Sequence, residues 1–406
     1  MTTKQLIGTY TSGYTLSAVY SAVNVTSKAS ITGFQPSSGY SQGGVGLLMP
    51  QTATLTNAGA IRGGKGSYAY YQAHRLLPGG VGGIGVDATA GSIIHNDLGL
   101  IAGGAGGDGG DHQSGGGGGD GILLGPGGSV GNTRGSVIQG GNGGLGGYAF
   151  TGGLGGTAVD MAGGALSNDR GQIAGGYGGS AEGAVRASDR FGSGGDGGVG
   201  VIMRTAGSVQ NSRGTIAGGA GGRNDYYGTP GAGGVAIILL SGGTIVNTNG
   251  GAVAGGRGGS NPAGESAGAK GGAGVVLYSG GALINNAASS ISGGQGGGNG
   301  RYVDGGAGGA GVILETSGSV FNGGTVNGGD GGDDAALNDP TTGSSTGVGG
   351  AGVILKAGGV VTNNGRIMGG GGGRVAVGGY GFGGSGGAGV YFLGSGTLNN
   401  YGGIVG

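Results

Sequence analysis

The sequence predicts an all-β protein built as a parallel β-solenoid, and three observations carry that prediction. A short pattern of strand-forming residues recurs along most of the 406 residues, an asparagine stands at the same place in each copy, and 128 residues are glycine. The 7 prolines are too few for a collagen triple helix. No stretch shows the apolar spacing of an amphipathic helix.

Each repeat reads as a GVxL-like strand, then SGGxVxN, then GxIxGG, followed by a glycine-rich insertion. Residues 198–219 and 234–256 are adjacent clear copies. Within a copy apolar and polar residues alternate, as in Val209-Gln210-Asn211, which is the period of a strand. Three short strands in about 20 residues fit one coil of a solenoid. About ten coils, each roughly 4.8 Å above the last, would form a rod of about 50 Å around columns of Val, Ile and Leu.

The recurring asparagine predicts a ladder of side-chain amides along the solenoid. Copies of it lie 36 to 43 residues apart. An amide at a turn can bond the same amide in the coils above and below, which satisfies groups that would otherwise be buried without partners. The alternative, in which these asparagines line a ligand groove, stays open. The ladder residues are Asn57, Asn96, Asn132, Asn168, Asn211, Asn247, Asn285, Asn322, Asn363 and Asn399.

The glycine-rich insertions predict arms beside the solenoid. Runs such as GGAGGDGGD from Gly103 and GGNGGLGG from Gly140 place a glycine doublet at every third residue. That period suits a polyglycine II-like backbone with three residues per turn, because two of its three edges can then approach neighbouring chains closely. We expect ordered arms of about 25 Å that form a bundle. Flexible linkers are the alternative. We expect residues 1–42 to form an opening coil and residues 43–406 the ten-repeat solenoid with its insertions.

Larger side chains gather in the middle of the insertions, where the arms should have their tips. Tyrosine and arginine on a projecting surface are frequent contact residues. We expect them to mediate lateral packing, with recognition of sugars as the alternative. These arm-tip residues are Tyr70, Tyr71, Arg75, Arg223, Tyr226, Tyr227, Arg301 and Tyr302.

Composition and motifs argue against an enzyme. The charges of the 18 basic and 18 acidic residues cancel, so the chain lacks the excess of positive charge that binds nucleic acid. The absence of cysteine excludes disulfides and thiolate chemistry. G-x-S-x-G matches at Ser41, Ser129 and Ser385 precede no helix, and a phosphate-loop spacing that ends at Lys65 has glycine where a hydroxyl is needed. We therefore predict a protein without catalytic residues or a cofactor.

Calcium is the one ion that the sequence leaves open. Glycine–aspartate runs around Asp108 and Asp111, and around Asp330 and Asp333, resemble the first half of a calcium-roll repeat. Tandem copies nine residues apart are missing, and such rolls need adjacent turns to share carboxylates. The histidines, His74, His95 and His112, have no ligand spacing.

The coil pattern T-V-x-N-x-G-x-I-x-G resembles the repeats of bacterial autotransporter-like and haemagglutinin-like surface proteins, and the opening GTYTSGYTLSAVYSAVNVTSKASITG is similar to their first coil. The resemblance covers about half of the chain. It implies a right-handed parallel β-helix outside the cell with an adhesive or matrix role. The heavy glycine arms depart from that group and resemble the polyglycine sandwiches of some phage tail adhesins.

Location and assembly follow from the same observations. The start MTTKQLIGTYTSGYTL is not a classical secretory signal, and no apolar run approaches the roughly 20 residues that span a bilayer. The absence of cysteine favours export, so we expect an extracellular or cell-surface protein by a route that the sequence does not show. No nucleic acid or membrane partner is expected.

The two ends of the repeat array predict self-assembly. The last copy, GSGTLNNYGGIVG, has no charged or helical cap, and an open coil offers unpaired backbone groups to another strand. We expect subunits to stack head to tail into an extracellular filament or matrix, and lateral bundles stay open as a further level of assembly. The alternative is an adhesin that recognises surface glycans through its arm tips. The expected interface residues are Leu6, Tyr10, Tyr14, Leu16, Val23, Val25, Tyr391, Leu398, Tyr401 and Ile404.

Overall fold

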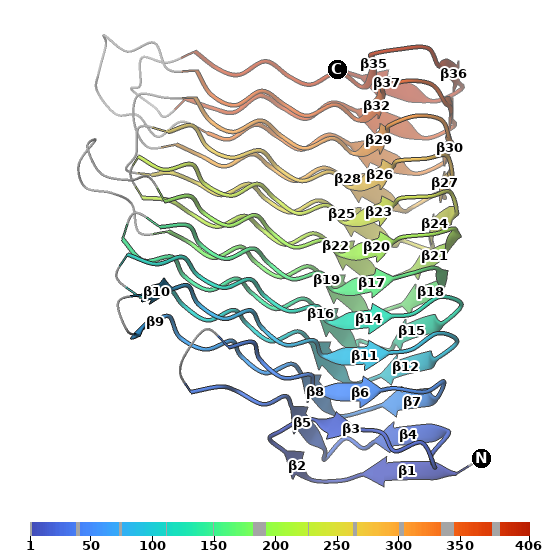
Figure 1. Ribbon diagram of the computed structural model, residues 1–406. Helices are drawn as coiled ribbons and strands as arrows, with labels where there is room; N and C mark the ends of the chain where they lie inside the picture. Colours follow the sequence, from blue (N-terminus) through green and yellow to red (C-terminus); the bar gives the residue numbers. More distant parts are fainter. Residues whose placement is uncertain are drawn as a thin grey trace.

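The computed structural model is a parallel β-solenoid from which glycine-rich arms extend to one side (Figure 1). All regular secondary structure in the described residues is β-strand. The predicted fold class, all-β with a parallel solenoid, is therefore confirmed. The structure describes residues 2–37, 41–72, 75–110, 112–148, 150–181, 192–225, 227–262, 266–299, 304–333, 345–375 and 382–406.

Three parallel sheets, here named A, B and C, form the walls of the solenoid. Sheet A consists of β1 (Thr3–Leu6), β4 (Ala22–Val25), β7 (Thr54–Asn57), β12 (Ile93–Asp97), β15 (Ser129–Thr133), β18 (Gly164–Asp169), β21 (Gly207–Ser212), β24 (Thr244–Thr248), β27 (Ala282–Asn285), β30 (Ser319–Asn322), β33 (Val360–Asn363) and β36 (Thr397–Asn400).

Sheets B and C complete each coil. Sheet B consists of β2 (Thr9–Tyr10), β5 (Ser30–Thr32), β8 (Ala60–Arg62), β13 (Leu100–Ala102), β16 (Val137–Gln139), β19 (Gln172–Ala174), β22 (Thr215–Ala217), β25 (Ala252–Ala254), β28 (Ser290–Ser292), β31 (Thr325–Asn327), β34 (Arg366–Met368) and β37 (Gly403–Val405). Sheet C consists of β3 (Tyr14–Thr15), β6 (Leu47–Met49), β11 (Val86–Ala88), β14 (Ile122–Leu124), β17 (Val159–Met161), β20 (Val201–Met203), β23 (Ile237–Leu239), β26 (Val275–Leu277), β29 (Val312–Leu314), β32 (Val353–Leu355) and β35 (Val390–Phe392).

The coils stack in register, so equivalent positions of successive repeats lie directly over one another. In sheet A, for example, Val209 of β21 pairs with Ile245 of β24, which pairs with Leu283 of β27. The hydrogen bonds between parallel strands are evenly spaced, so the same short strand can pair in the same way with its copy in each successive coil. Residues 1–42 contribute β1 to β5, which belong to two successive coils.

The core is a set of continuous apolar columns inside the three sheets. From β7 to β33 each sheet A strand buries one branched side chain, as at Val209, which is 1% exposed. From β6 to β32 each sheet C strand buries its first and third residues, as at Val201 and Met203, both 0% exposed. Removal of these side chains from water is the main stabilising contribution, about 25 cal/mol per Å² of apolar surface. At the first coil, half-buried Tyr10, Tyr14 and Tyr20 pack against this core.

An arm connects sheet B to sheet C in most coils (Figure 1). We call the segment that leaves sheet B the out leg and the segment that enters sheet C the return leg. In the coil of β16 and β17, for example, residues 140–147 are the out leg and residues 151–158 the return leg. One arm also carries an antiparallel pair, β9 (Tyr70–Gln72) with β10 (Arg75–Leu77).

Candidate binding surfaces

The asparagine column forms a continuous chain of amide hydrogen bonds. Each Nδ2 donates to the Oδ1 of the next coil's asparagine at 2.8 or 2.9 Å, from Asn57 through to Asn400. From Asn57 to Asn363 the asparagines of this column are 0% exposed. Their amides therefore bond one another and the adjacent turns inside the wall, and line no open groove.

The prediction of Asn399 as the last member of the column is wrong, because the column ends at Asn400. In β33 the asparagine stands two residues after the inward-facing Val361, and Val361 pairs with Leu398 of β36. The residue two positions after Leu398 is Asn400, whereas Asn399 pairs with Thr362 on the outer face. Because side chains alternate between the two faces of a strand, the register of β36, and not the spacing along the chain, determines which of the two asparagines joins the column.

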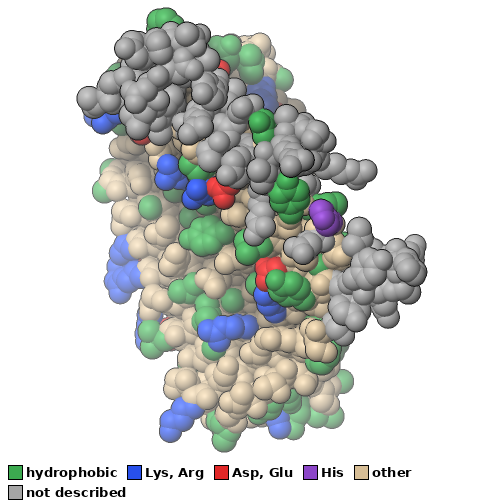
Figure 2. Space-filling model, turned by 90° about the vertical axis from the view of Figure 1, so that its left-hand side faces the viewer, with side chains coloured by type: hydrophobic (Ala, Val, Ile, Leu, Met, Phe, Trp, Pro, Cys, Tyr) green, Lys and Arg blue, Asp and Glu red, His purple; other side chains and the backbone are tan. Residues whose placement is uncertain are grey.

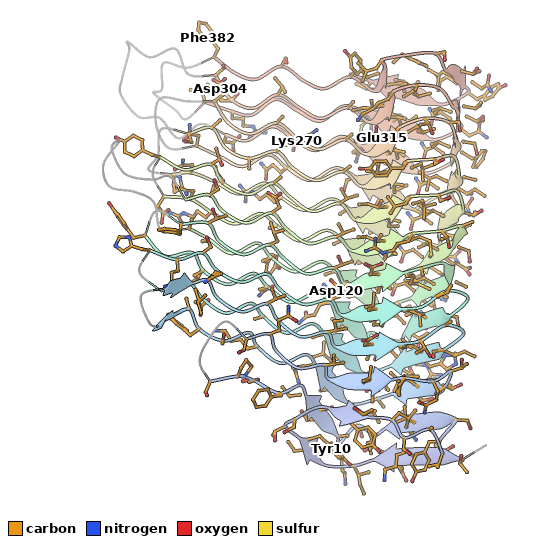
Figure 3. The ribbon with its side chains drawn as sticks, in the orientation of Figure 1. Tyr10, Asp120, Lys270, Asp304, Glu315 and Phe382 are labelled. Carbon is orange, nitrogen blue, oxygen red and sulfur yellow. The ribbon has the colours of Figure 1, made fainter. Side chains whose placement is uncertain are left out.

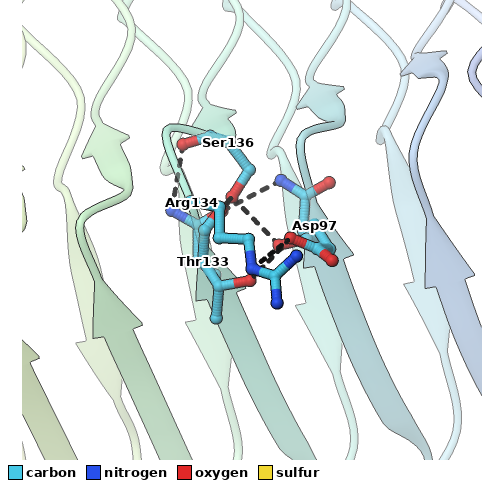
Figure 4. A network of polar contacts seen from close by, with 6 residues as sticks. Asp97, Thr133, Arg134 and Ser136 are labelled. Carbon is cyan, nitrogen blue, oxygen red and sulfur yellow. Dashed lines mark hydrogen bonds and ion pairs between the residues drawn. The ribbon is translucent and has the colours of Figure 1, made fainter.

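The turn beyond the column holds a second polar network (Figure 4). Ser136 donates to Asn132 Oδ1 at 2.8 Å, and Thr133 donates to Asp97 Oδ1 at 3.2 Å. Arg134, which adopts a left-handed φ of 54°, places its Nε 3.8 Å from Asp97. These contacts tie neighbouring turns together on the outer corner of the solenoid.

The legs of successive arms are joined by hydrogen bonds that repeat every third residue. In one out leg, Gly103 donates to Gln139 at the end of β16 at 2.9 Å, and Gly106 donates to Asn142 in the out leg of that next coil at 2.8 Å. Gly104 and Gly107 donate to a return leg, at 2.7 and 2.8 Å. The same cross-leg bonds run without a break from Gly44 to Gly387. The arms are therefore tied into one slab two layers thick, and not left as independent loops.

Glycine is required in this slab because backbones press together. A Cβ on Gly103 would lie 1.9 Å from the carbonyl oxygen of Gly119, and one on Gly104 would lie 2.0 Å from that of Gly64. Real Cβ atoms need about 3.4 Å or more. Every glycine with a left-handed φ lies outside the arm legs among the described residues, so close approach and not backbone freedom selects glycine here.

The third residue of each triplet points outward, and its N–H often bonds a side chain from the coil below. Asp108 accepts from the N–H of Leu145 at 3.0 Å, Asp120 from Thr157 at 2.9 Å, and Asn142 from Tyr177 at 3.0 Å. Without these acceptors the third N–H would be left to solvent. Aspartate and asparagine at third positions therefore link the legs of successive coils at the outer surface of the slab.

This role extends to the carboxylates that the sequence left open for calcium. Asp330 accepts from the N–H of Gly371 and Asp333 from that of Arg374, both at 2.8 Å. With Gln295 and Arg374 they line a pocket of about 270 Å³ on the out-leg face. The described residues include no group of three acidic or histidine side chains placed to hold a metal, and Asp111 and His74 lie outside them.

The arm-tip residues are only partly described. Arg223 is exposed and pairs with Asp225 at 2.7 Å, and Tyr227 is half-buried. Tyr70, Tyr71 and Arg75 belong to β9 and β10. Tyr226, Arg301 and Tyr302 lie outside the described residues. In the view onto the outer ends of the arms, apolar, basic and acidic side chains are interspersed (Figure 2).

Sequence reasoning missed a second set of buried asparagines toward the outer ends of the arms. Asn224 and Asn261 are 0% exposed and Asn299 is 2% exposed. Asn224 donates to the carbonyl of Gly192 at 2.7 Å, and Asn261 donates to that of Gly228 at 3.3 Å. The available signal was their shared position, directly after two glycine triplets of an out leg.

Charged groups cluster where one return leg enters the solenoid (Figure 3). Arg204 donates from Nε to Asp160 at 2.7 Å, and Asp160 is only 4% exposed. Burial raises the pKa of neighbouring Asp120, the N–H of Thr157 lowers it, and the charge of Asp160 raises it further. The hydrogen bond from Arg204 to Asp160 and their attraction raise the pKa of the guanidinium.

The predicted interface residues fall into two groups. Leu6, Leu16, Val23 and Val25 are at most 1% exposed in the core, so their assignment to a subunit contact is wrong; the tyrosines of the first coil pack against this core. Tyr10 and Tyr14 are half-buried and meet edge to face, with ring centroids 5.7 Å apart.

At the other end of the solenoid, Tyr391 is 48% exposed and Tyr401 79% exposed. Leu398 and Ile404 are partly buried against the core. The apolar surface at this end is therefore larger than the sequence indicated, since Phe392 and Leu393 are also exposed, at 40 and 58%.

Among the described residues no helix is long and apolar enough to cross a bilayer. No protein-family model matches the chain, and no curated protein matches it. Among solved structures it is similar to PfbA, a surface adhesin of Streptococcus pneumoniae, with 10% identity, a TM-score of 0.20, and coverage of 99% of this chain and 83% of that one. A likeness this weak bears on neither the ligand nor the role of this chain.

Proposed function

We propose that this protein is a structural subunit outside the cell, whose solenoids stack end to end into a filament or surface matrix. The observation that carries the proposal is the uncovered apolar coil of β35, β36 and β37. Tyr401 is 79% exposed and Phe392 40% exposed, whereas Leu355, directly below Phe392 in the same column, is 0% exposed. A coil from a second solenoid would cover this surface as each coil covers the one beneath it.

The backbone supports the same arrangement. The outer edge of β36 presents N–H and C=O groups that pair with no strand in the described chain, and such an edge accepts another strand. The opposite end presents different side chains, including Ile7 and Val19, which are 66 and 67% exposed. A contact between two different ends does not close on itself and therefore grows lengthwise. The period of three in the arm hydrogen bonds supports a polyglycine II arrangement, which would stiffen each subunit.

Negative-stain electron microscopy of the purified 406-residue protein tests the proposal. We expect long filaments of uniform width, and their loss in Tyr401→Lys, which places a charge in the contact. Tyr177→Lys is the matched control, because Tyr177 is 60% exposed on an arm and away from the ends. Discrete short rods at every concentration, or filaments that Tyr401→Lys leaves unchanged, would contradict end-to-end stacking.

An adhesin that binds surface polysaccharide is the second candidate. The observation that favours it is the presence of exposed aromatic and basic side chains on the arms: Tyr68 and Tyr177 are 57 and 60% exposed, and the Arg223 side chain is 55% exposed. Aromatic faces stack on sugar rings, and such a module needs no polymer. Binding to a glycan array by discrete rods, lost in Tyr177→Ala, would favour this candidate over the filament.

A further inference from the structure

The last coil of the described chain is incomplete on the side of sheet C and the arms. Sheets A and B are 12-stranded, whereas sheet C is 11-stranded, so the last coil consists of β36 and β37 alone. We call residues 369–373 the last out leg and residues 383–389 the last return leg. No further arm or sheet C strand of the described chain lies over these two legs and β35 (Figure 1). The place over them is here named the end recess.

Two glycines of the last return leg face the end recess, where no contact within the described chain requires glycine. In earlier return legs the first glycine of a doublet faces the out leg of the next coil. A Cβ on Gly349, for example, would lie 2.0 Å from the carbonyl oxygen of Gly370. A Cβ on Gly386 would have its nearest atom 3.6 Å away, and one on Gly383 would have none within 4 Å. Neither glycine has a left-handed φ, so close approach of another backbone is the need that glycine meets at the equivalent places.

Backbone N–H groups along the end recess have no partner in the described chain. In the preceding return leg, the N–H groups of Gly349 and Gly352 donate to the last return leg, both at 2.9 Å. The equivalent N–H groups of Gly386 and Gly389 have no acceptor among the described residues, and neither has that of Gly372 in the last out leg. An extended chain that presents carbonyl groups with the same period of three would bond all of them.

The end recess continues into an uncovered apolar strand. β35 is the end strand of sheet C, and its Phe392 pairs with Leu355 at the inward-facing third position. Leu355, which has β35 over it, is 0% exposed, whereas Phe392 is 40% exposed and Leu393 58%. From β6 to β32 the next strand always continues this column with buried first and third residues. A strand with apolar first and third residues would therefore cover β35 in the same way.

The opposite edge of the slab is closed to this kind of contact. Phe34 follows Gly33 in the first out leg, where the next out leg has its second glycine, Gly64. A Cβ on Gly64 would lie 2.0 Å from the carbonyl oxygen of Phe34 in the leg below. By the same geometry the side chain of Phe34, which is 56% exposed, projects toward the place of a further leg. A second copy of this chain therefore cannot lay its first arm in the end recess, and its other arms are bonded within its own slab.

We propose that the end recess binds a glycine-rich segment of a different polypeptide chain, built like one arm of this protein followed by a sheet C strand. Gly383 and Gly386 admit the backbone of its first leg, the N–H groups of Gly386 and Gly389 bond its second leg, and β35 pairs with its strand. Main-chain hydrogen bonds hold the segment, as in strand addition to a sheet edge, and the lack of side chains in its glycine doublets selects it. The recess exists on a single subunit, so the proposal does not rest on end-to-end stacking.

Fluorescence anisotropy with a labelled synthetic peptide tests the proposal. The peptide has the sequence of residues 140–161, which comprise one arm and the sheet C strand β17. The protein is Tyr401→Lys, so that end-to-end contacts do not compete for the peptide. We expect saturable binding, and a Kd at least about 10-fold higher when Gly386→Ala is added, since its methyl group would meet the peptide backbone. Amide hydrogen exchange at Gly386 and Gly389 should slow when the peptide binds to the parent.

Ser385→Ala is the matched control, because Ser385 is the adjacent third-position residue and is exposed on the outer surface of the slab. This variant should bind the peptide like its parent. Gly386→Ala should fold normally, since its Cβ has no atom of the chain closer than 3.6 Å, and circular dichroism and the melting temperature verify this.

A second peptide, with the glycine doublets of its first leg replaced by alanine, should not bind. Absence of saturable binding to the parent up to about 1 mM would overturn the proposal. Equal affinities of Gly386→Ala and Ser385→Ala, or equal binding of the alanine peptide, would also overturn it. Filaments that persist in Tyr401→Lys would refute only the end-to-end proposal.

Discussion

Two neighbouring glycines allow a direct test of why the arms need glycine. Gly116 and Gly117 are consecutive residues of one return leg. A Cβ on Gly116 would lie 2.0 Å from the carbonyl oxygen of Gly80 in the coil below, whereas the nearest atom to a Cβ on Gly117 would be 3.7 Å away. Gly116→Ala should therefore force two legs apart, and Gly117→Ala should fit without movement.

The structure sets the size of the difference. To reach an ordinary contact of 3.4 Å, the legs must separate by about 1.4 Å, which takes a 2.8 or 2.9 Å hydrogen bond beyond bonding distance. At about 1 kcal/mol net for each bond lost, Gly116→Ala costs about 3 kcal/mol, reduced to about 2 by the lower entropy of the unfolded chain. Gly117→Ala keeps every bond and gains about 0.4–1 kcal/mol. The three bonds at this contact are Gly79 to Ser114, Gly82 to Gly117 and Gly107 to Gly80.

Chemical denaturation of both variants, with amide hydrogen exchange at Gly82 and Gly107, measures this difference. Exchange is needed because an arm can open while the solenoid remains folded. We expect Gly116→Ala to lower the unfolding midpoint and speed exchange at both amides, and Gly117→Ala to do neither. Equal effects of the two substitutions would refute the argument that backbone contact selects glycine at the first two triplet positions.

Two further predictions concern the polar groups. Asn211→Ala removes four hydrogen bonds of the buried column and should lower the free energy of unfolding by about 4 kcal/mol, measured by equilibrium unfolding. Asn400→Ala, at the exposed end of the column, should lower it by about 1 kcal/mol or less. Equal losses in the two variants would contradict a structural column. Since the pKa of Asp120 is raised on folding, its ionisation weakens the fold as pH rises through that pKa. Asp120→Asn, whose side chain can still accept a hydrogen bond from Thr157, should therefore raise the melting temperature at pH 7. Below about pH 3 the substitution should leave the melting temperature unchanged, because Asp120 is protonated there in both the folded and the unfolded wild type. An unchanged melting temperature at pH 7 would refute this.

The solenoid could be predicted from the sequence because each coil repeats one pattern with one marker residue. The intervals of 36 to 43 residues between asparagines translate directly into the register of sheet A, as in the pairing of Asn211 with Asn247. The same spacing could not choose between Asn399 and Asn400. That choice depends on which face of β36 carries Leu398, and the final repeat offers two asparagines in succession.

The candidate surfaces were harder to predict for a different reason. Leu6 and Val25 read as contact residues because the opening segment looks like a single uncovered coil, yet two coils stack there and bury them. The role of Asp330 in bonding a neighbouring backbone likewise depends on the stacking of arms.

Amide hydrogen exchange along one arm, measured by NMR, tests most directly whether distant segments of this chain lie backbone to backbone. In the out leg at residues 218–222, the N–H groups of Gly219, Gly221 and Gly222 donate to neighbouring legs, and that of Gly218 donates to Ala254 at the end of β25. The N–H of Ala220 has no acceptor within the described chain. We predict slow exchange at these four glycines and fast exchange at Ala220. Uniformly fast exchange across these five residues would contradict it.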